Sequence, residues 1–201
     1  MISKRVVIIG SDGQLGCDLM RVFGDRAIGL THKDIEITDA DMVFSVLSKL
    51  KPDVVINTAA IVKSEWCEIN REACFKVNAY GAQNVAKASA AIGAVSVFIS
   101  SDYVFDGHKQ SFSESDIPVS LNVYGTSKLE GEQLTKTSNS RHYIIRTSWL
   151  FGVQVSHKGY DFPRLMLKVA REKGQVSVVN DQFGSPTYTY DLSLKIKQLV
   201  D

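Results

Sequence analysis

Short apolar segments that alternate with segments of helical periodicity constrain the fold of this chain more than any other feature. The segments that read as strands are residues 5–10, 27–32, 52–60, 95–101 and 142–152. Helical spacing of apolar residues marks the stretches 14–24, 39–50 and 71–93, and a further helix carries residues 122–132. Strands this apolar are buried on both faces, and helices between them are crossovers between parallel strands. The sequence therefore predicts an α/β fold with a doubly wound parallel sheet.

The strict alternation ends at Gly152. Residues 162–174 read as a helix, residues 175–181 as a strand and residues 191–201 as a last helix. We expect residues 1–152 to form one domain around the sheet. Residues 153–201 are expected to hold the end of that sheet and the start of a second, substrate-binding lobe that the chain leaves incomplete.

Composition and charge narrow the classes of partner. Of the 201 residues, 44% are hydrophobic and 22% are charged, and the formal net charge is +1. This balance favours neither a nucleic acid nor a membrane surface as partner. The apolar runs are too short to span a bilayer, and the N-terminus lacks the long apolar region of a signal peptide. We therefore expect a cytoplasmic protein.

The cysteines point to neither a disulfide nor a metal site. Cys17, Cys67 and Cys74 are odd in number, and their spacing fits no zinc template. We expect reduced, mostly buried thiols and predict no metal ligands.

A glycine-rich turn between the first strand and the first helix predicts a nucleotide site. In "GSDGQLG", Gly10, Gly13 and Gly16 have the spacing G-x-x-G-x-x-G, which differs from the strict dinucleotide pattern G-x-G-x-x-G. Glycines allow a tight turn and close approach of the backbone to a pyrophosphate, which then meets the free N–H groups of the helix start. The fold is therefore expected to be Rossmann-like.

The end of the second strand, "LTHKD", favours NADPH over NADH. An NAD site usually ends this strand with an acidic residue that binds the ribose 2′-OH. Here the strand ends in Thr31, His32 and Lys33, and a neutral residue followed by basic ones accommodates a 2′-phosphate. We predict that Thr31 and His32 contact the cofactor, with NADH as the alternative. The basic residues can equally form a plain solvated turn.

Tyr124 and Lys128 lie one helical turn apart in "NVYGTSKLEGE". The fourth strand delivers Ser101 to the carboxyl edge of the sheet, where catalytic groups of parallel sheets gather. A neighbouring ammonium stabilises a phenolate, so a tyrosine in this position can exchange a proton near neutral pH. The plainer interpretation is an amphipathic helix with one aromatic anchor and a solvated lysine.

With this turn and Ser101, Tyr124 and Lys128 in order, the chain resembles the extended type of the short-chain dehydrogenase/reductase superfamily. It is most similar to the dTDP-4-dehydrorhamnose reductase family. The motifs that carry the resemblance are "GSDGQLG", "INTAA", "VNAYGAQNVA", "SSDYVFDG", "NVYGTSKLEGE", "RTSWLFG" and "DQFGSPTY". They extend from Val6 to about Leu192, essentially the whole chain.

The resemblance implies a role for each catalytic position. Tyr124 would protonate the C4 carbonyl oxygen of a 4-keto-6-deoxy sugar as hydride arrives from NADPH. Lys128 would hold the nicotinamide ribose and lower the tyrosine pKa, and Ser101 would hydrogen-bond the reacting oxygen. The further positions implied at the cofactor are Gly10, Gly13, Gln14, Leu15, Gly16, Glu36, Ile37, Ala59 and Ala60.

The resemblance also implies a dTDP-sugar substrate and a possible homodimer. Trp149 would present an aromatic face to the sugar, although a core or interface role suits a tryptophan as well. Val62 and Ser64 fall where the family also meets substrate. Some relatives bind Mg²⁺ at an acidic dimer contact that includes the position of Asp18, but one carboxylate predicts no metal site.

Two other functions fit the same motifs. One is a nucleotide-sugar epimerase or dehydratase of the same superfamily, which would hold NAD tightly. The other is a non-catalytic, NADP-binding regulatory subunit, because family members normally continue for several dozen residues after "DQFGSPT". The presence of Ser101, Tyr124 and Lys128 favours an enzyme.

Overall fold

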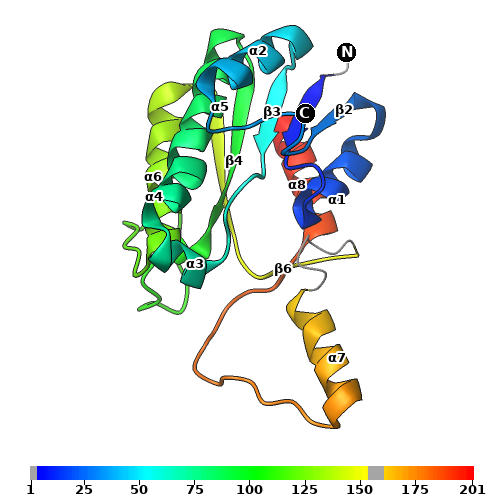
Figure 1. Ribbon diagram of the computed structural model, residues 1–201, viewed down its shortest axis with the longest axis vertical. Coiled ribbons are helices and arrows are strands. Elements are labelled where there is room, and N and C mark those ends of the chain that lie inside the picture. The colour runs from blue at the N-terminus through cyan, green and yellow to red at the C-terminus, as the bar shows by residue number, and fades with distance from the viewer. Residues whose placement is uncertain (1–3, 154–160) are drawn as a thin grey trace.

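The computed structural model of the chain describes residues 4–153 and 161–201 (Figure 1). Its central sheet has five parallel strands in the spatial order β2-β1-β3-β4-β5. These are β1 (Val6–Ile9), β2 (Ala27–Leu30), β3 (Val54–Asn57), β4 (Val95–Ser101) and β5 (His142–Thr147). The strand order reverses direction between β1 and β3, where doubly wound sheets bind ligands at their carboxyl edge. The predicted parallel, doubly wound fold is confirmed.

Helices cover both faces of the sheet. α1 (Gln14–Phe23) and α8 (Thr189–Val200) lie on one face, and α2 (Ala40–Leu50), α5 (Ala82–Ala91) and α6 (Val123–Ser138) lie on the other (Figure 1). Because side chains of a strand alternate between faces, Val6 and Ile8 join the core beneath α1 and α8, and Val7 and Ile9 join the core on the opposite side. The final helix α8 thus returns to the sheet and packs against α1.

The helix predicted at residues 71–93 changes its pitch along its length. After α3 (Ser64–Ile69), it consists of α4 (Arg71–Phe75), a π-helical turn η2 (Lys76–Gly81) and then α5. Asn78, in the π-helical turn, accepts a hydrogen bond from the N–H of Ile61 at 2.8 Å and donates to its carbonyl at 2.9 Å. These bonds fix the loop that follows β3. The 3-10 turns η1 (Gly24–Arg26) and η3 (Asp102–Val104) follow α1 and β4.

The strand predicted at residues 142–152 is interrupted. Trp149 has a φ of 44°, a left-handed conformation that no strand continues through. Residues beyond it form β6 (Leu150–Phe151), which pairs in parallel with β7 (Thr187–Tyr188) in a separate two-stranded sheet. The sequence pattern missed this break because Trp149 lies within a run of apolar and β-branched residues.

The strand predicted at residues 175–181 is wrong. These residues are irregular and exposed between α7 (Phe162–Lys173) and β7. In Figure 1 this segment and α7 extend below the main body, so no neighbouring strand among the described residues offers hydrogen bonds. Alternation of apolar residues alone does not form a strand without such a partner.

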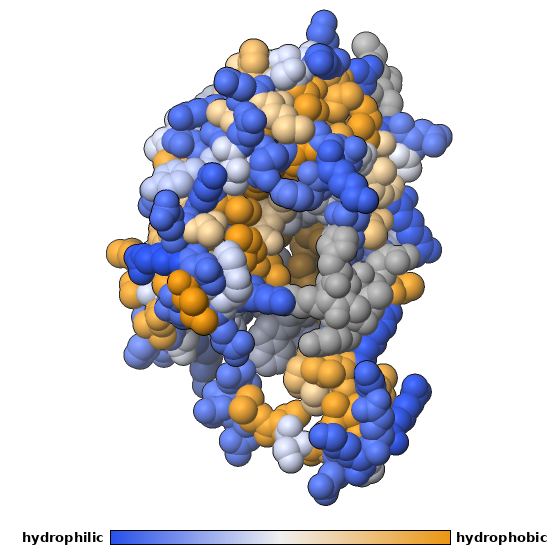
Figure 2. Space-filling model, in the orientation of Figure 1, coloured by the Kyte–Doolittle hydropathy of each residue, from blue (hydrophilic) through white to orange (hydrophobic). Residues whose placement is uncertain are grey.

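The outer surface of the α7 segment is mixed in character. Phe162 is 61% exposed and Leu167 is 57% exposed. Figure 2 shows hydrophobic residues on the upper part of this segment, toward the main body, and hydrophilic residues on its outer side. In residues 4–153 and 161–201, no helix combines the length and the apolar character that crossing a membrane requires.

Candidate active site

A cavity of about 680 Å³ opens at the carboxyl edge of the sheet. The glycine turn before α1, the end of β4, the first turns of α6 and the segment around Trp149 form its walls. Its lining includes most of the predicted site residues, namely Gly13, Gln14, Leu15, Gly16, Ala60, Val62, Ser64, Ser101, Tyr124, Lys128 and Trp149. The sequence therefore located residues that the fold brings together from five separate segments.

The glycine turn is built so tightly that its glycines cannot be replaced freely. A Cβ atom on Gly16 would lie 2.1 Å from the carbonyl oxygen of Gly10, and one on Gly10 would lie 2.7 Å from the Thr58 Oγ1. Gly10 also has a φ of 80°. Gly13 is the N-cap of α1 and provides no side-chain cap, so the first N–H groups of this helix face the cavity without one. This arrangement fits the pyrophosphate of a dinucleotide.

The remaining predicted cofactor residues lie along the same edge, outside the lining of the cavity. At the end of β2, the N–H and the hydroxyl of Thr31 donate to Asp34, at 2.8 and 2.7 Å. These bonds lower the pKa of Asp34, the backbone bond being the larger cause. Because its pKa is lowered, Asp34 stays ionised, and its negative charge lies in the same turn as the exposed His32 and Lys33.

On the surface, His32 Nδ1 lies 3.5 Å from Glu36 Oε2, a contact that is an ion pair only when the imidazole is protonated. Ile37 is buried in the core against Gly81, so its side chain serves packing. Ala59 follows β3 beside Gly10, since a Cβ on Gly10 would lie 3.1 Å from the Ala59 nitrogen. The structure therefore leaves the backbone of Ile37 and Ala59, and the side chain of Glu36, as the groups that could meet a cofactor.

Tyr124 lies in the first turn of α6, which begins where the Asn122 side chain accepts a hydrogen bond from the Gly125 N–H at 2.8 Å. Burial raises the pKa of Tyr124 to about 12, while a hydrogen bond with Ser101 acts in the opposite direction. The expected lowering of the tyrosine pKa by Lys128 is not seen: Lys128 is not among the groups that shift this pKa, and loss of hydration is the largest cause. The phenol stays protonated at neutral pH and remains a proton donor.

Lys128 is almost completely buried, with 2% of its surface exposed. Its ammonium lies 4.0 Å from the centre of the Phe98 ring, within the range of a cation–π contact. Burial lowers the pKa of Lys128 to about 7, although the charge of Glu132 opposes this shift. The interpretation of Lys128 as a solvated lysine on an exposed helix is wrong, because the helix packs this face against β4 and α5.

Asp102 is a site residue that the sequence reasoning missed. It lines the cavity next to Ser101, whose hydroxyl donates to its carboxylate at 3.1 Å. Burial raises the pKa of Asp102, against the lowering effect of this hydrogen bond. Its position directly after the strand-end serine was the available signal.

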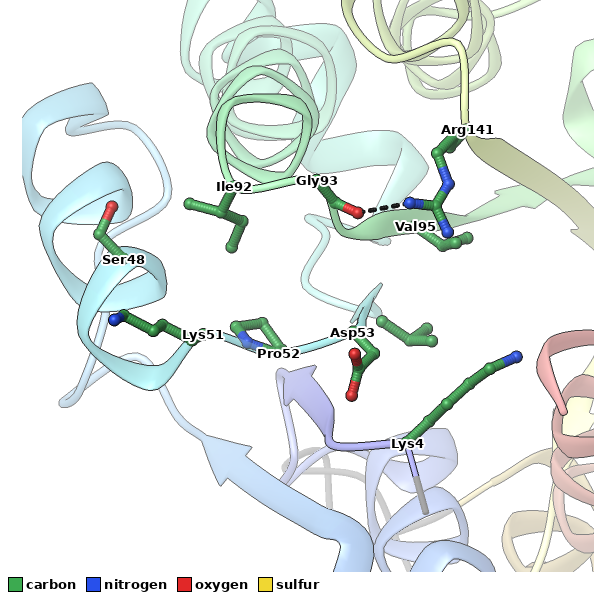
Figure 3. A pocket seen from close by; sticks show the side chains of 10 residues that line it. Lys4, Ser48, Lys51, Pro52, Asp53, Ile92, Gly93, Val95 and Arg141 are labelled. Carbon is green, nitrogen blue, oxygen red and sulfur yellow. Dashed lines mark hydrogen bonds between the residues drawn. The ribbon is translucent and has the colours of Figure 1, made fainter. Parts of the chain in front are cut away.

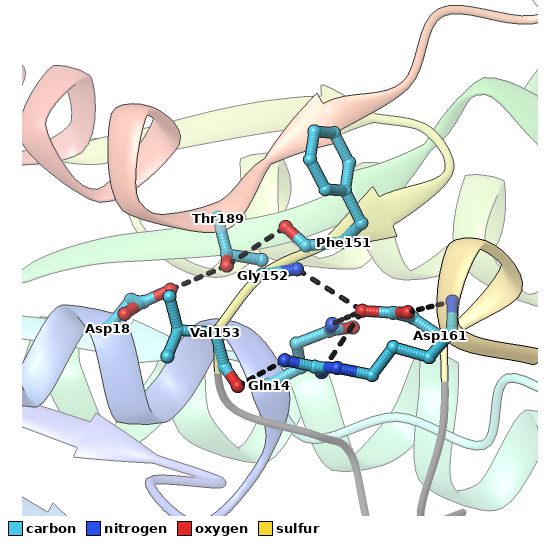
Figure 4. A network of polar contacts seen from close by, with 8 residues as sticks. Gln14, Asp18, Phe151, Gly152, Val153, Asp161 and Thr189 are labelled. Atoms are coloured by element: carbon cyan, nitrogen blue, oxygen red, sulfur yellow. Dashed lines mark hydrogen bonds and ion pairs between the residues drawn. The ribbon is translucent and has the colours of Figure 1, made fainter. Parts of the chain in front are cut away.

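Asp161 was also missed, and no local sequence signal could have revealed it. Its carboxylate accepts hydrogen bonds from the side-chain amide of Gln14 at 3.1 Å and from the N–H of Arg164 at 3.0 Å (Figure 4). It caps α7 and connects this helix to the glycine turn, 147 residues earlier in the chain. In the same view, Asp18 accepts a hydrogen bond from Thr189 on α8, which gives this carboxylate a structural partner.

A second hollow of about 520 Å³ lies at the amino edge of the sheet, far from the candidate catalytic residues (Figure 3). Arg141 is held there by a 2.6 Å hydrogen bond to the carbonyl of Gly93. The ammonium ends of Lys4 and Lys51 extend away from the hollow (Figure 3). The described residues bring together no group of three or more His, Cys, Asp and Glu side chains that could hold a metal ion.

Comparison with known proteins agrees with this geometry. The family model described as the RmlD substrate binding domain matches residues 4–201. A dTDP-4-dehydrorhamnose reductase of Aggregatibacter actinomycetemcomitans is 37% identical over 202 residues, covering 98% of this chain and 67% of that protein. The spore coat polysaccharide biosynthesis protein SpsK of Bacillus subtilis is 39% identical over 199 residues, covering 97% of this chain and 69% of that protein.

Among solved structures, dTDP-4-dehydrorhamnose reductase from Bacillus anthracis in complex with NADP superposes with a TM-score of 0.94. It is 37% identical, and the match covers 100% of this chain and 71% of that chain. The present chain thus spans about two thirds of the length of the relatives it matches.

Proposed function

The chain belongs to the family of the RmlD substrate binding domain and the dTDP-4-dehydrorhamnose reductases, and on that premise we propose that it reduces a dTDP-4-keto-6-deoxy sugar with NADPH. The reaction converts dTDP-4-dehydro-L-rhamnose to dTDP-L-rhamnose. The predicted family is confirmed. One observation supports the reaction above all: Ser101, Tyr124 and Lys128 line the same cavity as the uncapped N-terminus of α1.

The cofactor assignment rests on the fit of the glycine turn and on the NADP-bound relative. Bound NADPH supplies a hydride to the carbonyl carbon. Of the chain's own residues, the first N–H groups of α1 bind the pyrophosphate and Lys128 holds the ribose hydroxyls. The exposed His32 and Lys33 at the end of β2 favour the 2′-phosphate, so NADPH is preferred to NADH.

The proton chemistry follows from two hydroxyl groups. Ser101 donates a hydrogen bond to the carbonyl oxygen of the sugar and orients it toward Tyr124. The Tyr124 phenol, which its raised pKa keeps protonated, then gives its proton to the oxygen as negative charge develops there. The positive charge of Lys128 stabilises the phenolate that remains. Lys128 therefore stabilises mainly the phenolate form of Tyr124 that remains after the proton transfer.

The substrate occupies the opposite wall of the cavity in this proposal. Trp149 offers the sugar an aromatic face, Val62 lies on the loop after β3 that Asn78 holds in place, and Ser64 begins α3 directly after it. We also assign the dinucleotide to residues 1–152 and the grip on the nucleotide-sugar to residues beyond them. A cytoplasmic homodimer completes the proposal.

The test is NADPH oxidation by the purified chain, with dTDP-4-dehydro-L-rhamnose generated in the assay. Turnover that falls by about 100-fold or more in Tyr124→Phe would support the reductase and its acid. Tyr103→Phe is the matched control, because this neighbouring phenol contacts the Tyr124 ring and has no assigned proton transfer. If the parent chain binds NADPH but does not consume it, the assay is repeated with a chain extended to the length of its relatives. Turnover there would assign the loss to the missing part of the substrate site, and its absence would refute the reductase and favour a binding module.

A further inference from the structure

Two charged side chains lie buried one turn apart on the inner face of α6. Lys128 is 2% exposed and Glu132 is completely buried. Residues at this spacing have Cβ atoms about 5–6 Å apart. Lys128 lines the cavity, whereas Glu132 lies behind it, outside the lining. The Glu132 carboxylate is therefore the nearest fixed negative charge on the helix that carries the lysine.

Arg146 of β5 occupies both oxygens of this carboxylate. Its Nε donates to Oε1 at 2.9 Å and its Nη2 donates to Oε2 at 2.7 Å. The guanidinium lies 4.8 Å from the centre of the Phe105 ring, and Phe105 stacks on Phe112 with 4.2 Å between centroids. The arginine is thus held from two sides, and it holds Glu132 by a bidentate contact of fixed direction.

We propose that Glu132 and Arg146 are positioning residues that maintain the charge of Lys128 and keep its ammonium free to face the cavity. The role in the reaction rests on the proposed function above. Glu132 favours the charged ammonium inside a low-dielectric region. Arg146 prevents the carboxylate from bonding the ammonium itself, which would draw Lys128 away from the cofactor side.

A purely stabilising role explains this pair less well. A buried ion pair contributes little net stability, because desolvation of both charges opposes their attraction. In the part of the chain that the structure describes, no hydrogen bond or ion pair holds the Lys128 ammonium, and its contact is with the face of Phe98. A buried lysine whose ammonium has no hydrogen-bonded partner depends on nearby fixed negative charges to remain protonated.

The other ionisable groups around Lys128 come from each element packed against it. Tyr124 precedes it on α6, Cys74 faces it from α4, and Asp102 on η3 acts on Tyr124. β4 contributes the uncharged ring of Phe98. Glu132 has the largest effect of these neighbours on the lysine, ahead of Cys74.

The test follows the titration of Lys128 by NMR in the full chain, with lysine isotope-labelled at Cε and the signal assigned by Lys128→Arg. In Glu132→Gln the midpoint is expected to fall by about one unit or more, because the ammonium loses its favourable charge and still feels Arg146. In the double variant Glu132→Gln with Arg146→Met, the midpoint is expected to lie between those of the parent and the single variant.

Glu130→Gln is the matched control, since Glu130 is exposed on the same helix and undergoes the same change of charge. Its midpoint should equal that of the parent. If Glu132→Gln fails to fold, the double variant, which leaves neither member of the Glu132–Arg146 pair without its partner, still tests the proposal against the parent. Midpoints that are equal in the parent and in the Glu132 variants would overturn it.

Kinetics provide the functional half of the test. In the NADPH oxidation assay, the pH at which kcat declines on the alkaline side should move down in Glu132→Gln by the same amount as the NMR midpoint. A lower kcat with an unchanged pH profile would indicate a structural role and overturn the proposal. The NMR titration needs no turnover. It therefore tests the effect of Glu132 on Lys128 even if the chain proves not to be a reductase.

Discussion

The indole ring of Trp149 lies directly over Gly184. A Cβ atom at position 184 would approach the Cε2 atom of Trp149 to 2.6 Å. The hydroxyl of Ser148 donates to the carbonyl of Ser185 at 2.7 Å, which ties the same two segments together. Backbone strain at Trp149, with its φ of 44°, is thus maintained by its surroundings, as is common at binding sites.

Trp149→Ala is expected to raise the KM for the dTDP-sugar by roughly tenfold and to leave NADPH affinity nearly unchanged. Loss of an aromatic contact of about 1–2 kcal/mol has this effect on binding. Trp66→Ala is the control, because Trp66 is the other tryptophan of the chain and lies on α3 with 38% of its surface exposed. Equal KM values in both variants would contradict a sugar contact at Trp149.

Gly13 and Gly16 of the glycine turn should differ in their tolerance of an added methyl group. Gly16→Ala places Cβ 2.1 Å from the Gly10 carbonyl oxygen, so the free energy of unfolding should fall by about 3 kcal/mol or more. Gly13→Ala should fold, because its φ of −76° and ψ of 168° suit any residue and its Cβ would lie 3.1 Å from the Gly10 carbonyl oxygen, a contact that a small shift relieves. The added Cβ would lie at the start of α1, where we propose that the pyrophosphate binds, so NADPH affinity should fall by roughly tenfold. Thermal unfolding and NADPH fluorescence titration measure the two effects.

Cofactor preference is expected to depend on the turn after β2. Replacing both His32 and Lys33 by alanine should weaken NADPH binding by roughly tenfold and leave NADH binding unchanged, because only NADPH has the 2′-phosphate. Lys195→Ala, at an exposed position on α8, is the control for a general loss of positive charge. A parallel loss of NADH affinity would show that the turn contacts other parts of the cofactor.

Sequence predicted what local patterns determine. The β1 strand, the glycine turn and α1 are contiguous, and their spacing alone indicates a phosphate site. Tyr124 and Lys128 were identified for the same reason, since their separation by one turn is a property of a single helix. The parallel, doubly wound arrangement followed from the apolar character of the strands and from the crossover helices, whereas their spatial order was not predicted.

Sequence could not predict what depends on distant partners. The burial of Lys128 requires Phe98 of β4, and the fixed position of Glu132 requires Arg146 of β5. The strand expected at residues 175–181 failed because its apolar alternation has no partner strand in space. Asp161 became a site residue only through its bond to Gln14.

The three cysteines should differ in reactivity toward a thiol reagent. Cys67 and Cys74 are completely buried with 2.7 Å between their sulfur atoms, and burial raises the pKa of Cys67 to about 12. In the native chain, the partly exposed Cys17 should react slowly, and the buried Cys67 and Cys74 should not react. All three should react after unfolding in denaturant. Two thiols that stay unreactive in denaturant without a reductant would contradict the expectation of reduced cysteines.

Lys128→Met is expected to stabilise the cofactor-free chain while abolishing turnover. The pKa of Lys128 is near 7 in the folded chain and near 10.5 when unfolded, so the unfolded chain binds more protons between these values. The free energy of unfolding of the parent must therefore rise with pH across this window, by at most about 1.4 kcal/mol per unit. The destabilising contribution of Lys128 is absent above the unfolded pKa, grows as pH falls through this window and is fully present below about pH 7.

The stability advantage of Lys128→Met over the parent should accordingly be largest near pH 7 and shrink by roughly 2 kcal/mol by pH 9. Denaturant unfolding of both proteins at the two pH values measures this difference, and effects of other groups cancel in the comparison. Lys136→Met serves as control, because Lys136 is exposed on the same helix and its ammonium remains in water. If the stability advantage of Lys128→Met does not change with pH, the pKa of Lys128 is the same in the folded and the unfolded chain, and burial does not lower it.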